Sequence, residues 1–154
     1  FIVLCGPGNN GGDGLVISQG LKKLNQSVIL YSLKSMAYKG DAKIAYKKNQ
    51  LTKNNYNDLN IPKNSVIIDC LFGIGLNRKV KGMYKNIIKK VNKSKQYVIS
   101  IDIPSGINGD NGKIMGEAIK ANSTYTLHAK KIGLTVNSGM KYSGKVSIID
   151  IGIK

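Results

Sequence analysis

Six short runs of apolar, mostly β-branched residues recur along the sequence, and stretches with helical periodicity separate them. The runs cover residues 1–4, 28–33, 66–69, 97–102, 124–127 and 146–151. Runs that are apolar at nearly every position are typical of strands buried on both faces of a parallel sheet. Residues 15–24 and 83–91 carry an apolar stripe at helical spacing, and residues 41–51 carry a weaker one. The alternation predicts an α/β fold in three layers: a doubly wound, mostly parallel sheet with helices on both sides.

Length and chain ends bound the domain organisation. With 154 residues, 42% of them hydrophobic, the chain is long enough for one domain with its own core and too short for two of ordinary size. We therefore treat residues 1–154 as one domain and interpret the polar segment at 52–58 as a surface loop. The chain opens on "FIVL" without a methionine, so we expect it to be part of a longer protein, in which any targeting segment would lie outside this chain. The compartment stays open between the cytoplasm and a mitochondrion or other organelle, and no run is long enough to predict a membrane span.

Charge and cysteine content narrow the range of partners. The formal charge of +16 raises the question of a nucleic-acid partner, since clustered basic residues neutralise phosphates. However, all but one of the 24 basic residues are lysines, and they are scattered along the chain, which argues against a dedicated nucleic-acid face. Such a surface still attracts an anionic small molecule. The two cysteines, Cys5 and Cys70, are interpreted as reduced, buried thiols.

Three glycine-rich segments that bear carboxylates directly follow predicted strands. They lie at residues 5–14, 69–79 and 102–106. In doubly wound sheets, ligands bind outside the carboxyl ends of the strands, at the point where the strand order reverses. Because packing alone gives no reason for three such segments, we expect them to form one binding site.

The first segment, "CGPGNNGGDG" at residues 5–14, matches two nucleotide-binding patterns only in part. Gly6, Gly8 and Gly11 have the spacing of a dinucleotide-binding loop, but no acidic residue stands at the end of the next strand to hold a ribose. A phosphate-binding loop requires Gly-Lys-Ser/Thr where this chain has Gly-Asp-Gly. An ordinary turn with Asp13 as helix N-cap stays open, although it would need fewer glycines. The glycines favour close approach of a ligand to the main chain.

Motifs along almost the whole chain resemble one family. The segments "GPGNNGGDG", "DCLFGIGL", "DIPSG", "KKIGL" and "GKVSIIDIGI" occur in this order, and the match runs from residue 2 to residue 153. Together they resemble the NAD(P)HX epimerase family, also called the YjeF N-terminal domain. The resemblance implies a Rossmann-like fold and an isomerase of nicotinamide nucleotide repair, which interconverts the R and S forms of hydrated NADH or NADPH.

The resemblance also implies partners and a cofactor. A dehydratase that accepts only the S form would restore the cofactor, one K⁺ ion would bind in each subunit, and the protein would form a homodimer. The family's N-terminal helices are missing from this chain, so we expect a single domain of this type that lacks them.

Individual roles follow from the resemblance residue by residue. It implies substrate contacts at Asn9, Asn10, Gly11, Gly12, Asp13, Gly73, Ile74, Gly75, Leu76, Asn77, Arg78, Lys79, Asp102 and Lys131. It implies K⁺ ligands at Asn10, Asp69 and Ser105, whose amide, carboxylate and hydroxyl oxygens suit a hard cation. For these to meet, the strand at 66–69 must lie beside the strand at 1–4, in a flavodoxin-like 2-1-3-4-5 core order. The loop that ends in Arg78 and Lys79 would hold the substrate's pyrophosphate.

The chemistry requires a group that moves protons. Loss of the C6 hydroxyl beside the ring nitrogen leaves a resonance-stabilised cation, and water can return to the other face; ring opening to an aldehyde is an alternative route. We expect Asp102 to be catalytic, with Asp13 as second choice. A structural role for Asp102 in capping the following turn stays open. Ile74 stands where the family often has Thr, and the neighbours of Lys131 differ from the usual ones, which leaves its substrate contact open.

Two other functions compete with this interpretation. A catalytically inactive binding module for RNA or protein, as in decapping scaffolds, has a similar domain and would suit the basic charge. Such modules typically lose the Gly-Asp and Asp-Ser positions, whereas this chain has all of Asn10, Asp13, Asp69, Asp102 and Ser105. An NAD-dependent oxidoreductase is disfavoured by the missing ribose-binding acid.

Overall fold

The sheet positions every element of the site. The computed structural model describes residues 1–152, so Ile153, the last residue of the closing motif, lies outside the described part. The strands are β1 (Ile2–Cys5), β2 (Ile29–Tyr31), β3 (Lys53–Asn54), β4 (Val66–Cys70), β5 (Tyr97–Ile101), β6 (Ser123–Leu127) and β7 (Lys145–Ile149). All strand pairs are parallel, and the order across the sheet is β3-β2-β1-β4-β5-β6-β7. The predicted α/β class is confirmed.

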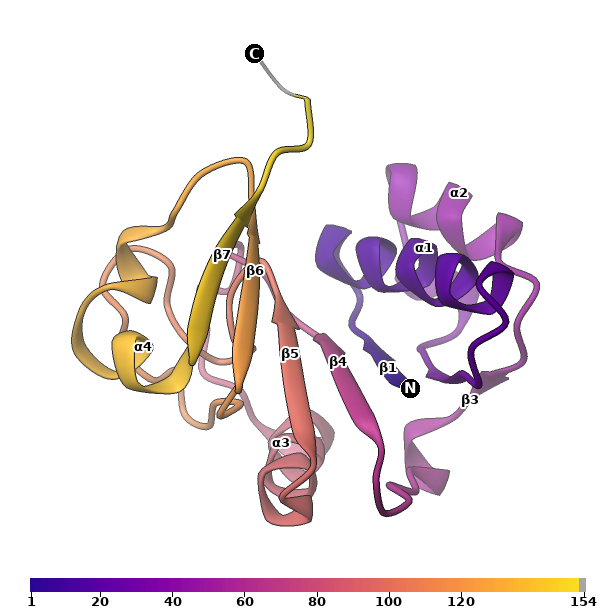
Figure 1. Ribbon diagram of the computed structural model, residues 1–154, viewed down its shortest axis with the longest axis horizontal. Helices are drawn as coiled ribbons and strands as arrows, with labels where there is room; N and C mark the ends of the chain where they lie inside the picture. The colour runs from indigo at the N-terminus through magenta and orange to yellow at the C-terminus, as the bar shows by residue number, and fades with distance from the viewer. Residues whose placement is uncertain (153–154) are drawn as a thin grey trace.

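Helices cover both faces of the sheet (Figure 1). They are α1 (Asn9–Lys23), α2 (Gly40–Lys48), α3 (Gly82–Ser94) and α4 (Asn137–Tyr142), with short 3₁₀ turns at η1 (Ser35–Ala37), η2 (Tyr56–Asp58) and η3 (Ile132–Leu134). Among the described residues, no helix combines the length and apolarity needed to cross a membrane.

Two of the three core clusters follow from the alternation of side chains along β1. Val3 and Cys5 belong to the cluster that includes residues of α1 and α2, and Ile2 and Leu4 belong to the cluster that includes residues of α3. All four residues are buried, as expected for a strand covered on both faces. The prediction of two-sided burial is wrong for β7, which forms an edge of the sheet and leaves Ile148 55% exposed.

The neighbour relation on which the site depends is observed. β4 pairs with β1 in a register that sets Leu4 opposite Asp69 and Cys5 opposite Cys70. β5 lies on the other side of β4, with Ser100 opposite Asp69. Because these strands are parallel, the segments that follow β1, β4 and β5 all emerge at one edge of the sheet.

The two cysteines lie side by side beneath α1. Both are free thiols, and both are fully buried, which agrees with the prediction. Gly14 of α1 rests directly on them: a Cβ atom at this position would lie 2.7 Å from Cys5 Sγ and 2.8 Å from Cys70 Cβ. Only glycine allows the helix to approach the sheet so closely. Burial raises the pKa of both thiols well above the usual value, so they remain protonated.

The segment at 52–58 is not the loop that its polar sequence predicts. It contains β3 and the turn η2. Tyr56 is 5% exposed, and its hydroxyl donates to the carbonyl oxygens of Cys5 (2.9 Å) and Tyr31 (3.2 Å). Tyr56 therefore holds this polar segment against the sheet, because its hydroxyl bonds to main-chain carbonyl groups at the ends of β1 and β2.

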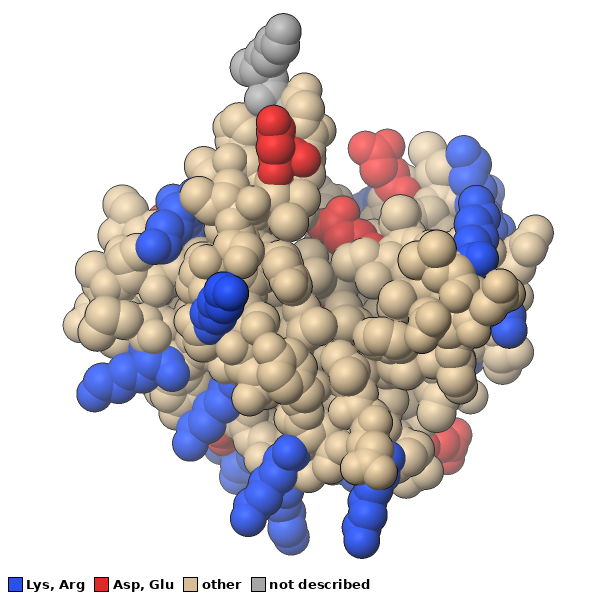
Figure 2. All heavy atoms as spheres, in the orientation of Figure 1, with Lys and Arg blue, Asp and Glu red and all other residues tan. Residues whose placement is uncertain are grey.

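Basic side chains spread over the visible surface, while acidic ones gather mainly near the carboxyl ends of the strands. Figure 2 shows Lys and Arg over the lower part and the sides of the molecule, with most of the red acidic groups toward the top. In the same orientation the carboxyl ends of β6 and β7 point upward. The field of the molecule thus differs between this edge and the rest of the surface.

Candidate functional site

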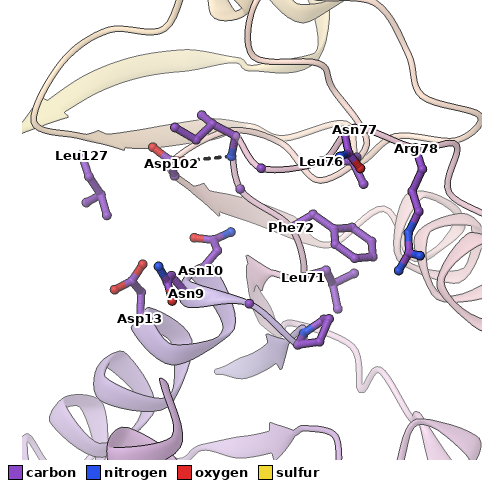
Figure 3. Close-up of a pocket in the computed structure, with 15 residues that line it drawn as sticks. Asn9, Asn10, Asp13, Leu71, Phe72, Leu76, Asn77, Arg78, Asp102 and Leu127 are labelled. Carbon is purple, nitrogen blue, oxygen red and sulfur yellow. Dashed lines mark hydrogen bonds between the residues drawn. The ribbon is translucent and has the colours of Figure 1, made fainter. Parts of the chain in front are cut away.

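A cleft of about 390 Å³ lies at the carboxyl edge of the sheet, between the start of α1, the segment that follows β4, and the ends of β5 and β6 (Figure 3). Its size is in the range of small-molecule sites. Most of the predicted substrate contacts line it: Asn9, Asn10, Asp13, Gly73 to Arg78, and Asp102. The cleft thus joins the three glycine-rich segments that the sequence places after three separate strands.

The glycine-rich segment after β1 is mostly helix rather than loop. α1 begins at Asn9 and not at residue 15, because its glycines fit against the sheet. The alternative role of Asp13 as N-cap is therefore wrong: Gly8 is the N-cap, and no side chain caps the helix. The first main-chain bond runs from Gly12 N to Gly8 O, which leaves the first three N–H groups of α1 without helical partners. These N–H groups and the helix dipole favour an anion at this end.

Four predicted contacts do not line the cleft. Gly11 and Gly12 serve packing: a Cβ on Gly11 would lie 1.9 Å from the Gly6 carbonyl oxygen, and one on Gly12 would lie 2.9 Å from Ala42. Lys79 is exposed outside the wall. Lys131 also lies outside it and contacts two residues of its wall, Asp102 and the carbonyl oxygen of Leu127.

Asp102 follows the last residue of β5 and has a left-handed backbone, with φ of +69°. Its Oδ1 lies 2.6 Å from Lys131 Nζ, and its Oδ2 accepts a hydrogen bond of 3.3 Å from the Ile74 N–H, drawn in Figure 3. Aspartate is one of the few residues that tolerate this conformation. The carboxylate is therefore held between the end of the sheet and the loop after β4.

Asp13 faces the same cleft from the second turn of α1. Burial raises the pKa of its carboxyl above the usual value, and the negative charge of Asp102 raises it further. The two aspartates are thus unequal: Asp102 has a cationic partner, whereas Asp13 holds a proton more readily than an ordinary aspartate.

Asp69 lies at the floor of this edge and is fully buried. Its carboxylate accepts four hydrogen bonds, from the Ser100 hydroxyl (2.7 Å), the Ser105 hydroxyl (2.6 Å), the Ser105 N–H (2.9 Å) and the Leu71 N–H (3.3 Å). Burial raises the pKa of Asp69, although these hydrogen bonds act in the opposite direction. Among residues 1–152 the one ion pair is that of Asp102, so no cationic side chain compensates Asp69.

Asn10 is the unsatisfied polar group of the site. It is 7% exposed, and within the described chain neither its amide oxygen nor its amide nitrogen has a hydrogen-bond partner. It lies against Gly73, where a Cβ would come within 3.3 Å of Asn10 Cβ and 3.1 Å of Asp102 Oδ2. A buried amide without a partner is rare in proteins and marks a place where a ligand is expected.

Of the three predicted ion ligands, two contact each other and the third lies near them. Asp69 and Ser105 are in direct contact, and the Ser105 hydroxyl also accepts from the Phe72 N–H (2.9 Å). Asn10 approaches the same segment through Gly73. No group of three or more His, Cys, Asp or Glu side chains suited to a metal occurs among the described residues. Any ion here would bind to mixed amide, hydroxyl and carboxylate oxygens.

Ile74 and Leu76 are the predicted apolar residues of the wall, and the others were not predicted. Pro7, Leu71, Phe72 and Leu127 line the cleft beside the polar groups, and Gly8 completes the loop before α1. Phe72 is itself held by an edge-on contact with Tyr84, with ring centroids 4.8 Å apart. Their positions in the sequence could have identified them, because each of these residues ends a predicted strand, directly follows one, or flanks a motif residue. Figure 3 places Phe72 and Arg78 at the end of the cleft away from Asp13 and Leu127.

Comparisons with known proteins agree on one family. The model described as "YjeF-related protein N-terminus" matches residues 1–133. The chain is 37% identical to the NAD(P)H-hydrate epimerase of Limosilactobacillus fermentum, in an alignment that covers 97% of this chain and 74% of that protein. It is 40% identical to the protein of the same name from Lentilactobacillus buchneri, over 99% of this chain and 72% of that protein.

Two further proteins show how the chain relates to longer ones. The bifunctional NAD(P)H-hydrate repair enzyme Nnr of Coxiella burnetii is 37% identical over 98% of this chain, which spans 32% of that protein. The crystal structure of the yeast protein ynu0 matches with a TM-score of 0.72 at 22% identity, over 97% of this chain and 64% of the yeast chain. The second likeness concerns the fold alone.

Proposed function

The chain belongs to the family of the YjeF-related protein N-terminus, and we propose that it is an NAD(P)H-hydrate epimerase, which interconverts the R and S forms of hydrated NADH or NADPH. The observation that carries this proposal is the cleft itself. It combines an anion-binding helix end, an apolar wall and two aspartates, Asp13 with a raised pKa and Asp102 in an ion pair with Lys131. A hydrated nicotinamide nucleotide presents the matching parts: phosphates, a largely apolar ring, and a hydroxyl that must leave and return.

We propose that the nucleotide's phosphates lie against the free N–H groups at the start of α1 and the loop of residues 73–78. Support comes from the start of α1, which no side chain caps, and from Arg78, which lies at the end of the cleft away from Asp13 and Leu127. Guanidinium groups and helix N-termini both bind phosphate oxygens well. The nicotinamide ring would then lie near Asp13, Asp102 and the apolar side chain of Leu127.

The reaction needs one proton delivered and one removed. In the proposed sequence, Asp13 donates a proton to the C6 hydroxyl, the C–O bond breaks, and water leaves behind a ring cation. The Asp102 carboxylate stabilises this cation, a water molecule adds to the other face of C6 and releases its proton to solvent, and Asp13 regains a proton from solvent. The raised pKa of Asp13 and the ion-paired state of Asp102 support this division of roles.

We also propose that Asn10, Asp69 and Ser105 hold one K⁺ ion beside the substrate. The buried Asn10 amide without a partner and the buried Asp69 charge without a cationic side chain fit a monovalent cation. The four hydrogen bonds on Asp69 imply that an ion would compete with the Ser105 hydroxyl for the carboxylate. When bound, the ion would add positive charge close to the phosphates of the substrate.

A dehydratase completes the proposed repair. We propose that this protein supplies the S form to such an enzyme, in line with the two-function name of the Coxiella burnetii relative. We further propose that it works as a homodimer and accepts hydrated NADH and hydrated NADPH.

The test is a coupled assay. Purified R-form hydrated NADH is mixed with a dehydratase that accepts only the S form, and the absorbance of the restored dihydronicotinamide is followed with and without this protein. We expect the protein to accelerate recovery well beyond the spontaneous rate. Recovery at the same rate with and without the protein would exclude the proposed function.

A further inference from the structure

The ends of β5 and β6 share one local geometry. Asp102 follows β5 with φ of +69°, and a hydrogen bond of 3.0 Å joins the main chains of the residues on either side of it. His128 follows β6 with φ of +64°, and the equivalent bond is 2.8 Å long. Such three-residue γ-turns with positive φ are rare and strained. Two of them on neighbouring strands at the edge of a ligand cleft indicate a functional constraint.

The second turn brings Lys131 to the first. Lys131 Nζ donates to the Leu127 carbonyl oxygen at 2.6 Å and lies 2.6 Å from Asp102 Oδ1. The two ion-paired side chains are 16% exposed for Lys131 and 12% exposed for Asp102. Lys131 thus anchors itself to the end of β6 and ties the end of β5 to it.

This anchoring leaves one carboxylate oxygen for the cleft. With Oδ1 engaged by Lys131, Oδ2 of Asp102 accepts only the long Ile74 N–H bond and lies on the side of Asn10 and Gly73. Two of the three N–H donors of Lys131 are used inside the protein, and its side chain does not line the cleft. These contacts argue against a direct substrate contact for Lys131.

We propose that Lys131 is a positioning residue: it holds the Asp102 carboxylate in the single orientation that presents Oδ2 to the cleft. The proposal rests on the epimerase function proposed above. A partly buried carboxylate that loses its only cationic partner is free to rotate. The charge of Asp102 also acts on Asp13 of α1, so a displaced Asp102 would change the surroundings of both aspartates.

Three variants test this proposal. Lys131→Met removes the charge and keeps the length of the side chain, Lys131→Arg keeps the charge, and Lys130→Met is the control on an exposed neighbour. We expect Lys131→Met to lower kcat about 100-fold with KM changed by less than about threefold, because the change affects acid–base chemistry rather than binding. The kcat of Lys131→Arg should lie within about tenfold of the wild-type value. The control variant Lys130→Met should have the same kcat as the wild type.

A crystal structure of Lys131→Met provides a second readout that does not need activity, and Lys131→Arg serves the same purpose should the methionine variant not fold. We expect the Asp102 carboxylate to leave its position in the methionine variant and to keep it in the arginine variant. An unmoved Asp102 with unchanged kcat in Lys131→Met overturns the proposal, as does a rise in KM alone, which would mark a substrate contact. A wild-type protein without epimerase activity would defeat the proposed function instead, and the position of Asp102 would still decide the role of Lys131.

Discussion

Asp69 and Asp102 stand at the ends of neighbouring strands, yet their surroundings are opposite. Asp69 is fully buried, accepts four hydrogen bonds from protein donors and has no cationic partner among the described residues. Asp102 lies one residue beyond its strand, has a lysine on one oxygen and turns the other toward the cleft. The difference arises at the strand ends: Asp69 is still within β4, where its side chain points into the protein, and Asp102 lies in the turn that leaves β5.

The contrast separates stability from chemistry. A carboxylate whose acceptor sites are all filled fixes the main chain around it, since each neighbour depends on it for a partner. A carboxylate with a free oxygen at a cleft can stabilise a cation or exchange a proton. The same residue type therefore serves two purposes at one edge of the sheet, and substitutions should separate them.

The largest expected effect is on catalysis at Asp102. Asparagine has the same size and tolerates a positive φ, so Asp102→Asn should keep the turn and the fold. We expect kcat to fall about 1,000-fold, because the charge that stabilises the ring cation is lost, while KM changes little. The coupled assay measures this, with Asp150→Asn on the exposed surface as control. Full activity in Asp102→Asn would show that Asp102 is structural.

Asp69 should give the reverse result, a large loss of stability. Asp69→Ala leaves buried hydroxyl and N–H donors of Ser100, Ser105 and Leu71 without partners. We expect the free energy of unfolding in urea to fall by about 3 kcal/mol or more, at constant K⁺. Asp110→Ala, at an exposed turn, should change it by less than about 0.5 kcal/mol. Equal stability of Asp69→Ala and wild type would mean that the four hydrogen bonds contribute nothing net.

Thermal unfolding in the presence of potassium tests whether Asp69 also belongs to an ion site. At ten times its dissociation constant, K⁺ should stabilise the protein by about 1.4 kcal/mol, which raises Tm by about 3 to 6 °C. Li⁺ at the same ionic strength should have a much smaller effect. Asn10→Ala should abolish the difference between the two ions, because it removes the amide that has no protein partner. Identical melting curves in K⁺ and Li⁺ for the wild type would argue against the ion.

The smallest effect concerns the pH dependence of stability at Asp13. Because burial raises its folded-state pKa above the ordinary value of 3.8, the folded protein binds more protons than the unfolded chain between the two values. The free energy of unfolding therefore falls as pH rises through this interval, and the stabilisation is fully present only below the unfolded value. Asp13→Asn should remove this contribution and be more stable than wild type at neutral pH, by less than about 1 kcal/mol since partial exposure screens the charge. An unchanged difference between the two proteins from pH 3 to pH 7 would contradict the raised pKa.

Much of the fold was predictable because burial on both faces leaves a direct mark on the sequence. The strands β1 and β4 are apolar at almost every position, and their neighbours in the sheet follow from the glycine-rich segments at one edge. The start of α1 was missed because Asn and Gly have poor helix propensity, whereas contacts of the glycines with the sheet stabilise the helix there. The segment around Tyr56 was missed because its role depends on a hydrogen bond to distant strands.

The site was predictable as a set of segments but not as a set of contacts. The motifs identify the loops that meet, and most of their residues line the cleft. Sequence spacing does not show that Lys131 pairs with Asp102, since that contact depends on two turns with positive φ. Nor does it show that Asp69 is fully hydrogen-bonded while Asn10 has no partner, because both facts depend on side-chain directions set by packing.

The contact between Gly14 and the two thiols gives the molecule an internal reporter of opening. Gly14 covers Cys5 and Cys70 next to Asp13, within the first two turns of α1 that also carry Asn10, so a thiol reagent can reach them only when this part of the helix separates from the sheet. The rate of labelling therefore measures how often the helical side of the cleft detaches. A bound nucleotide that holds the start of α1 in place should slow this labelling. The labelling rate would then report how much of the protein has nucleotide bound, in a chain that has no tryptophan whose fluorescence could report it.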